Sequence, residues 1–209
     1  TRDKILADIR KALGERTEPV APMLVSEDKI FSEQAEGLLA NFIRVFKAID
    51  GNVVFCADRY QLAAKLTDLI GRHHWTHITS TSTILKTCGS IAGVEVVENV
   101  VGADKLKQIE VGITDCEYLV ARTGTIVMSS AQPAGRIFPV YTPIHIVIAY
   151  EHQLVYGLDE AIAKMGERYD GDYPSAWYLV SGPSRTGDIE KTLVLGVHGP
   201  VEVYVFIVK

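Results

Sequence analysis

Apolar residues recur at helical spacing near the start of the chain, where they predict an amphipathic helix that Gly14 ends. Segment 17–28, which is rich in proline and acidic residues, predicts a linker after this helix. We therefore expect two parts: an N-terminal helix with its linker, residues 1–28, and an α/β domain, residues 29–209. The helix is expected to dock on a partner or on a second subunit. Its apolar positions are Ile5, Leu6, Ile9 and Leu13.

A broader apolar stripe between Phe31 and Ile49 predicts a long helix, and short strands then alternate with helices. Asp58 is a candidate N-cap for one of these helices, with Gln61 completing a capping box and Gly71 ending the helix. Alternation of this kind predicts a parallel sheet that is covered on both faces. The strands expected in this half are 52–56, 76–80 and 94–98, with a short helix after the second.

The second half of the chain has more strand-like segments. Two strands are expected around a turn at Thr123 and Gly124. A helix is expected over 159–169, and further strands over 143–150, 176–180 and 201–208. Together the elements predict an α/β fold with three layers, in which helices cover a mainly parallel sheet.

Composition and charge narrow the class of protein. The chain of 209 residues is 47% hydrophobic and carries a formal net charge of −5, which argues against nucleic-acid binding. No apolar run approaches the roughly 20 residues of a membrane helix, so no membrane association is expected. Cys56, Cys88 and Cys116 are widely spaced, which favours reduced thiols in the cytoplasm and no iron–sulfur cluster in this chain.

The stretch "SGPSRTGDIE", residues 181–190, follows a predicted strand and contains features of an anion-binding loop. If Thr186 caps a helix that runs to Gly196, the loop lies at a carboxyl strand end and at a helix N-terminus, and both places favour anions. The candidate ligand-binding residues here are Ser181, Gly182, Ser184, Arg185 and Thr186.

The same loop has a plainer interpretation. Ser184 or Thr186 could simply cap the helix, while Arg185 pairs with Asp188 or Glu190. A helix over 186–196 would be about 15 Å long. His198, a weaker candidate, would then lie too far from Ser184 to share a site.

Three other positions are candidates for ligand binding. Thr123, Gly124 and Thr125 could present backbone N–H groups to an anion, although Gly124 could equally just supply the positive φ of a hairpin. Arg136 could bind a carboxylate with both edges of its guanidinium, or lie on the surface. His145 lies on a predicted strand, where an inward-facing histidine is more often a hydrogen-bonded core residue than a catalyst.

His73, His74 and His77 have a spacing that suggests a metal site. We expect Gly71 to end the preceding helix before them, so these histidines should lack the helical geometry of a metal-binding pair. The sequence therefore predicts no metal here.

Three long motifs carry a resemblance to a known family: "GITDCEYLVARTGTIVMSS", "GRIFPVYTPIHIVIA" and "SGPSRTGDIEKTLVLGVHGP". Residues 110–209 resemble the lactate-utilisation protein C family (LutC/YkgG, the LUD domain). The resemblance implies a fold of the NagB/RpiA/CoA-transferase-like group. It also implies a role in oxidising L-lactate to pyruvate beside an iron–sulfur oxidoreductase subunit and a ferredoxin-like partner, with the clusters held only by those partners.

This chain departs from the family pattern in two places. Arg122 precedes the Thr-Gly-Thr turn where relatives usually have glutamate, which removes a possible carboxylate base and favours an anionic ligand instead. A Lys-Ser-Met motif and the paired glutamates that often follow the second strand are replaced by "TSTILKTCGS".

Two functional hypotheses follow, and a scaffold role is a third. The first is an auxiliary or ligand-binding subunit of a lactate-utilisation system that binds a small anion at the 181–186 loop. This subunit could form a homo-oligomer. The second is a stand-alone enzyme of the same fold group that acts on a phosphorylated, CoA-linked or folate-like substrate. Such an enzyme needs a general base, for which Glu110, Glu117 and Glu151 are available but not singled out. The scaffold is favoured if Arg185 is buried and paired within its own helix.

Overall fold

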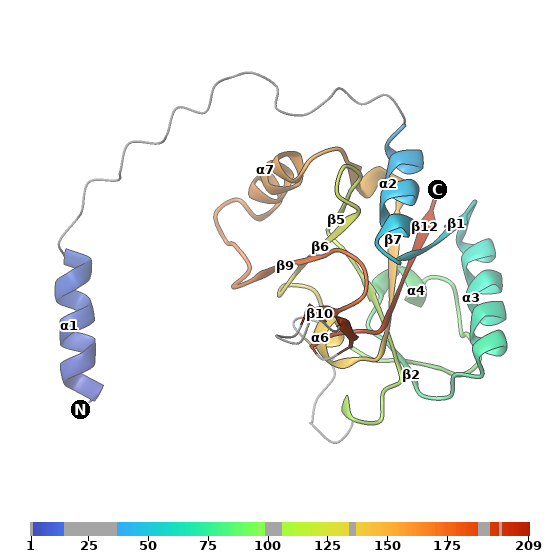
Figure 1. Ribbon diagram of the computed structural model, residues 1–209, viewed down its shortest axis with the longest axis horizontal. Helices are drawn as coiled ribbons and strands as arrows, with labels where there is room; N and C mark the ends of the chain where they lie inside the picture. Colours follow the sequence, from blue (N-terminus) through green and yellow to red (C-terminus); the bar gives the residue numbers. More distant parts are fainter. Residues whose placement is uncertain (1, 15–36, 99–105, 134–136, 188–192, 197) are drawn as a thin grey trace. The chain divides into compact units, whose positions relative to one another are not determined.

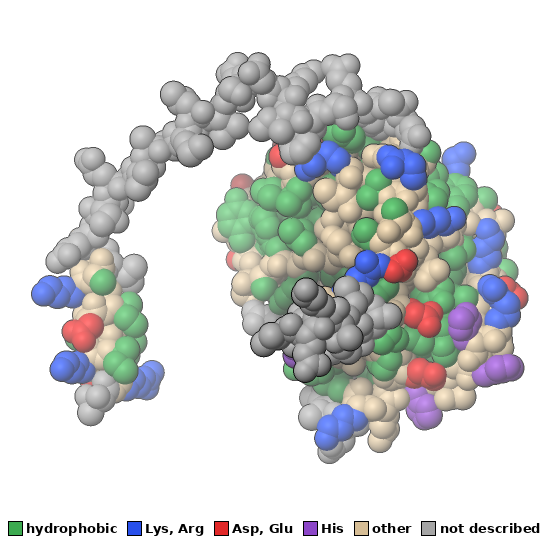
Figure 2. All heavy atoms as spheres, viewed as in Figure 1, with side chains coloured by type: hydrophobic (Ala, Val, Ile, Leu, Met, Phe, Trp, Pro, Cys, Tyr) green, Lys and Arg blue, Asp and Glu red, His purple; other side chains and the backbone are tan. Residues whose placement is uncertain are grey.

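The computed structural model describes residues 2–14, 37–98, 106–133, 137–187, 193–196 and 198–209. The chain divides into two compact units, residues 1–33 and residues 34–209. The first contains helix α1 (Arg2–Gly14), so the predicted N-terminal helix is confirmed. Figure 2 shows its apolar side chains along one side, with Ile5 and Ile9 exposed. The predicted linker lies outside the described residues.

The centre of the second unit is a six-stranded parallel sheet with the order β1-β12-β7-β4-β2-β3 (Figure 1). Strands β7 and β12 are buried along almost their whole length, as expected for a parallel sheet that is covered on both faces. The predicted parallel sheet is thus confirmed. Its strands are β1 (Asn52–Cys56), β2 (Ile78–Ser80), β3 (Val94–Val96), β4 (Val111–Asp115), β7 (Ile144–Tyr150) and β12 (Glu202–Val208).

Helices α3 (Arg59–His73) and α4 (Thr83–Lys86) cover one face of this sheet. Apolar side chains of α3, such as Leu62 and Leu66, pack there against the inward-facing isoleucines of β4 and β7. Asp58 caps α3 as predicted, because its side chain accepts a hydrogen bond from the Gln61 backbone N–H. Gly71 does not end the helix: α3 continues to His73, and His74 in the left-handed conformation ends it.

The opposite face is covered by helix α2 (Leu38–Ala48) and by a second sheet with the order β8-β5-β6-β9. Phe42 and Phe46 of α2 pack with Ile126 and Met128 of the second sheet against the parallel sheet. Helix α7 (Leu158–Tyr169) covers the outer side of this second sheet. The predicted layered α/β fold is confirmed, with a small sheet beside the helix in one layer. The strands of the second sheet are β5 (Tyr118–Val120), β6 (Thr125–Ser129), β8 (Leu154–Val155) and β9 (Trp177–Val180).

The segment after β9 forms a hairpin, so the predicted helix over 186–196 is wrong. Strands β10 (Arg185–Gly187) and β11 (Leu193–Leu195) pair antiparallel. Gly187 and Gly196 disfavour a helix, and the β-branched Val194 between them favours a strand. Two short helical segments complete the described elements: α6 (Phe138–Tyr141) and the 3₁₀ helix η1 (Glu151–Gln153).

Two consequences follow for the 181–186 loop. Since β9 belongs to the second sheet, Ser181 does not lie at the carboxyl edge of the parallel sheet. Since no helix begins at Thr186, the loop lacks the positive end of a helix dipole. The expected separation of His198 from Ser184 is also wrong. The Ser184 N–H donates to the carbonyl of Pro200, two residues beyond His198.

Candidate functional site

A polar pocket of about 360 Å³ lies beyond the carboxyl ends of β2, β4 and β7. Open parallel sheets commonly bind ligands at this edge, and a water molecule occupies about 30 Å³ of liquid, so the pocket has room for a small organic molecule. It is lined by Thr81, Thr83, Ile84, Thr114, Asp115, Cys116, Glu117, Ala131, Gln132, Pro133, Tyr150, His152, Gln153, Arg168 and Tyr169.

Asp115, the last residue of β4, fixes the start of α4 at one side of the pocket. The Thr83 backbone N–H and side-chain hydroxyl donate to Oδ2 over 2.7 and 2.5 Å, and the Ser82 hydroxyl donates to Oδ1. Ser82 also caps α4 by accepting a hydrogen bond from the Leu85 N–H. Each oxygen of Asp115 therefore has a donor from the protein.

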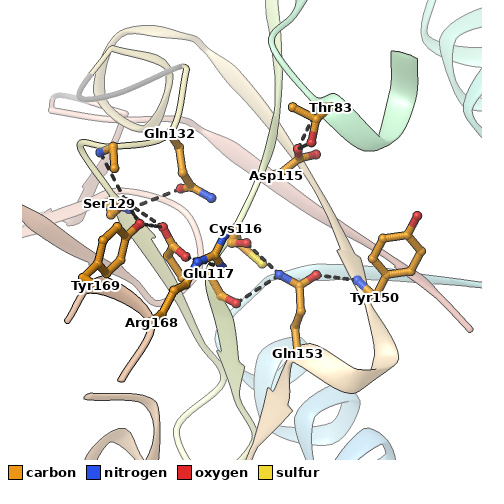
Figure 3. Close-up of polar contacts among 11 residues, drawn as sticks. Thr83, Asp115, Cys116, Glu117, Ser129, Gln132, Tyr150, Gln153, Arg168 and Tyr169 are labelled. Carbon is orange, nitrogen blue, oxygen red and sulfur yellow. Dashed lines mark hydrogen bonds and ion pairs between the residues drawn. The ribbon is translucent and has the colours of Figure 1, made fainter. Parts of the chain in front are cut away.

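Glu117, two residues further on, is almost completely buried, with 1% of its side chain exposed. Its Oε1 accepts hydrogen bonds from the hydroxyls of Ser129, over 2.6 Å, and Tyr169, over 2.7 Å (Figure 3). Nη1 of Arg168 lies 2.9 Å from Oε2, which makes an ion pair without the alignment of a hydrogen bond. Desolvation, followed by the hydrogen bond to Glu117, raises the pKa of Tyr169.

Two glutamines hold the walls of the pocket. Nε2 of Gln153 donates to the backbone carbonyls of Cys116 and Glu117 over 2.7 and 3.0 Å, while its Oε1 accepts from the Tyr150 N–H (Figure 3). Oε1 of Gln132 accepts from the Ser129 N–H over 3.2 Å. Gln153 thereby ties η1 to the backbone at Cys116 and Glu117, whereas Gln132 closes a local turn after β6.

His145 contacts the pocket only through Thr114. Its side chain is completely buried, and its Nε2 lies 2.9 Å from the Thr114 hydroxyl. Nδ1 has no hydrogen-bond partner among the described residues. Burial lowers the pKa of His145 from 6.5 to about 3, so the imidazole is neutral near pH 7. His145 is thus placed as a core residue beneath the pocket.

The structure brings three of the predicted residues together at a different place. The Thr125 hydroxyl lies 2.7 Å from that of Thr123 and 2.8 Å from that of Ser181. Gly124 has a φ of 60°, and a Cβ there would lie 3.0 Å from the Phe46 backbone nitrogen. The turn is therefore packed tightly on α2, and its hydroxyls bond to one another.

The rest of the 181–186 loop is tied to neighbouring segments. Arg185 forms an ion pair with Asp50, and its side chain is 39% exposed. The condition for a scaffold role, a buried Arg185 paired within its own helix, is not met. Gly182 has a φ of 77°, and a Cβ there would lie 2.5 Å from the Ile49 carbonyl oxygen. Ser184 is half-buried and His198 is exposed.

Among the predicted positions that the structure describes, none lines the carboxyl-edge pocket. Thr186 lies in β10, and Arg136 lies outside the described residues. The 181–186 anion site stays a prediction, without the helix terminus that it was expected to have.

The side chains of His73 and His77 make contacts with other residues by ring stacking and hydrogen bonding. The rings of His73 and Trp75 stack with centroids 4.6 Å apart, and His77 Nδ1 lies 2.9 Å from the Thr76 hydroxyl. Within the part of the chain that the structure describes, no group of three or more metal-binding side chains is positioned to hold an ion. No helix in the described ranges is long and apolar enough to span a membrane.

The sequence analysis named Glu117 only as an available general base and missed the other principal residues of this pocket, Asp115, Gln132, Arg168 and Tyr169. Asp115 ends a buried strand and Glu117 lies two residues further on, in "GITDCEYLV", and that position was the available signal. Arg168 and Tyr169 lie on α7, about fifty positions further along the chain, and no local pattern connects them to Glu117.

The fold and the pocket define an α/β protein whose candidate ligand site lies at the carboxyl edge of a parallel sheet. A family model of the LUD domain matches residues 96–208, and the chain belongs to this family. The resemblance found in the motifs is thus confirmed.

Curated relatives match about half of the chain. A lactate utilization protein C of Halalkalibacterium halodurans is 33% identical over 112 residues, which are 51% of this chain and 47% of the relative. A protein of the same name from Bacillus licheniformis is 35% identical over 107 residues, 50% of this chain and 45% of the relative. This chain thus matches these relatives over less than half of their length.

A solved structure shows the same fold. The crystal structure of a DUF162 family protein from Deinococcus radiodurans superposes with a TM-score of 0.62 at 17% sequence identity. The match covers 82% of this chain and 96% of that protein.

Proposed function

We propose that this chain takes part in lactate utilisation as a ligand-binding component, with its ligand in the carboxyl-edge pocket. Family membership and the names of the curated relatives support the pathway. The observation that carries the ligand site is the pocket itself, where Asp115, Glu117 and Arg168 converge from β4, the segment after it and α7.

The resemblance to the family favours a division of roles between this chain and redox partners. Oxidation of lactate to pyruvate removes two electrons and two protons, which must pass to an acceptor. We expect the electrons to pass to iron–sulfur oxidoreductase subunits, on which helix α1 is expected to dock. The chain then acts as an auxiliary subunit.

A stand-alone enzyme remains the second candidate, and Glu117 favours it. A buried carboxylate at a pocket is suited to general acid–base chemistry. Its Oε1 already accepts two hydrogen bonds, however, so a catalytic role requires the ligand to displace the Tyr169 or Ser129 hydroxyl.

Reconstitution tests the proposal. The purified full chain is assayed for L-lactate-dependent dye reduction alone, and then with the iron–sulfur subunits of the same system. We expect no turnover by the chain alone and turnover in the complete mixture that depends on it. Turnover by the isolated chain, abolished in Glu117→Gln, would favour the stand-alone enzyme. A complete mixture whose rate does not change when the chain is left out would reject the role in lactate utilisation.

A further inference from the structure

Among the described residues of the pocket, the acidic acceptors already contact protein groups, whereas some donors do not. Both oxygens of Asp115 and Oε1 of Glu117 accept hydrogen bonds from protein groups, and the buried Oε2 of Glu117 forms the ion pair with Arg168. The two acidic side chains, which would otherwise repel an anion, are therefore occupied by protein groups. A ligand meets few open acceptors from them.

Donors, in contrast, remain available. A guanidinium has five N–H donors in a planar fork. The described contacts of Arg168 are the one from Nη1 to Glu117 and one with the ring of Tyr169, 5.9 Å from its centroid. Its side chain is 57% exposed at the pocket, so the remaining edge is accessible.

Gln132 adds a second donor at the same pocket. Its Oε1 accepts a hydrogen bond from the Ser129 N–H, and its amide nitrogen lies on the other side of the side-chain amide (Figure 3). Within the described part of the chain this nitrogen has no hydrogen-bond partner.

We propose that Arg168 and Gln132 bind the oxyanion group, a carboxylate or a phosphate, of the ligand in this pocket. Glu117 acts as a positioning residue: held by Ser129 and Tyr169, it fixes one edge of the Arg168 guanidinium so that the other edge can form paired hydrogen bonds to an oxyanion. This inference rests on the proposed function in placing the ligand in the pocket, and adds which chemical group is recognised there.

Binding of inorganic phosphate and, separately, of L-lactate to the full-length chain tests the inference by titration calorimetry. We expect wild type to bind phosphate, Arg168→Gln to bind it at least tenfold more weakly, and Gln132→Ala about threefold more weakly. Arg168→Lys keeps the charge without the fork and should fall between wild type and Arg168→Gln.

Arg185→Gln tests the 181–186 loop as the alternative anion site. Arg72→Gln is the matched control, because Arg72 is also an exposed arginine paired with a carboxylate, that of Asp68, but does not line the pocket. It should bind phosphate as wild type does. Glu117→Gln tests positioning: it should weaken phosphate binding several-fold although Arg168 is retained. Circular dichroism of each variant at the assay temperature shows that the comparison is made between folded proteins.

Three results would overturn the inference. In the first, wild type binds neither anion; in the second, Arg168→Gln and Arg168→Lys bind phosphate as wild type does. In the third, phosphate binding is lost only in Arg185→Gln. The last result would place the anion at the 181–186 loop. If phosphate binds in a way that depends on Arg168 and L-lactate does not bind, the result supports recognition of an oxyanion group. It then indicates that the ligand is phosphorylated. If the reconstitution fails but anion binding still depends on Arg168, only the role in lactate utilisation is rejected. The failure of the proposed function and the failure of this inference are therefore distinguishable.

Discussion

At the scale of single residues, His145 shows how burial decides the behaviour of a titratable group. The side chain lies in the middle of the parallel sheet with one hydrogen bond, to Thr114, and its charged form would lose its hydration there. Its pKa is lowered to about 3 for this reason. Near neutral pH its imidazole is therefore uncharged in the folded protein.

This shift predicts a pH dependence of stability. Above pH 6.5 the imidazole is neutral in both states, so its contribution is fully present. As the pH falls below 6.5 the unfolded chain takes up a proton that the folded protein excludes until about pH 3, and the unfolding free energy decreases. The expected loss is up to about 1.4 kcal/mol per pH unit.

Urea denaturation between pH 4 and 7 measures this slope. His145→Gln should reduce the pH dependence of the unfolding free energy by about one proton relative to wild type. Equal slopes in wild type and His145→Gln would contradict the assignment.

Gly182 gives a second prediction at this scale. Its positive φ of 77° and the Ile49 carbonyl oxygen, 2.5 Å from the place of a Cβ, both oppose any side chain. Gly182→Ala should cost about 3 kcal/mol or more, from backbone strain together with the clash. Gly171→Ala is the control, because Gly171 has a φ of 89° but no atom near its Cβ position, and should cost only about 1–2 kcal/mol. Similar losses in chemical denaturation would show that the contact with Ile49 relaxes.

At the scale of elements, the start of α3 is set by one side chain. The Asp58 carboxylate accepts a hydrogen bond of 2.8 Å from the Gln61 N–H, and Gln61 Oε1 accepts one from the Ala57 N–H. This reciprocal pattern resembles a capping box shifted by one residue, and it satisfies two N–H groups at the start of the helix.

Removal of the cap should therefore destabilise the protein measurably. Asp58→Ala is expected to cost about 1 kcal/mol of unfolding free energy, because the Gln61 N–H loses its acceptor. Asp68→Ala removes the same charge from the same helix, where Asp68 makes only an exposed ion pair with Arg72, and should change stability by less than about 0.5 kcal/mol. Thermal denaturation of both variants checks the difference; an equal effect would mean that charge, and not capping, matters.

Most elements were predictable because their signals are local. A cap such as Asp58 or an apolar run such as β7 is read from neighbouring residues, and both were confirmed. The β10–β11 hairpin was mistaken for a helix because its pairing depends on contacts beyond the segment: the Ser184 backbone bonds to Gly196 and Pro200. A capping-type residue at Thr186 cannot override that pairing.

At the scale of the whole molecule, every buried side chain of the described core belongs to residues 42–208. A chain beginning at residue 34 therefore contains the complete described core, and we expect it to unfold cooperatively. Its midpoint should lie within about 2 °C of that of the full chain, since a shift of that size corresponds to about 0.5–1 kcal/mol for a domain of this length.

Differential scanning calorimetry compares the two chains. A midpoint lowered by 5 °C or more would contradict the expectation and show that residues 1–33 stabilise the domain. A peptide of residues 1–14 alone should be only marginally helical in water, because isolated helices of this length rarely repay the cost of nucleation.

The sequence by itself determined the parallel sheet, most helix and strand positions, the Thr123–Gly124 turn and the family. These features depend on periodicity, caps and motifs that extend over a few neighbouring residues. Only the tertiary structure decided that a second sheet shares a layer with α2, that the 181–186 loop leads into a hairpin, and that Glu117 meets Arg168. Those features join residues far apart in the chain, and their geometry follows from how the layers pack, which no local pattern records.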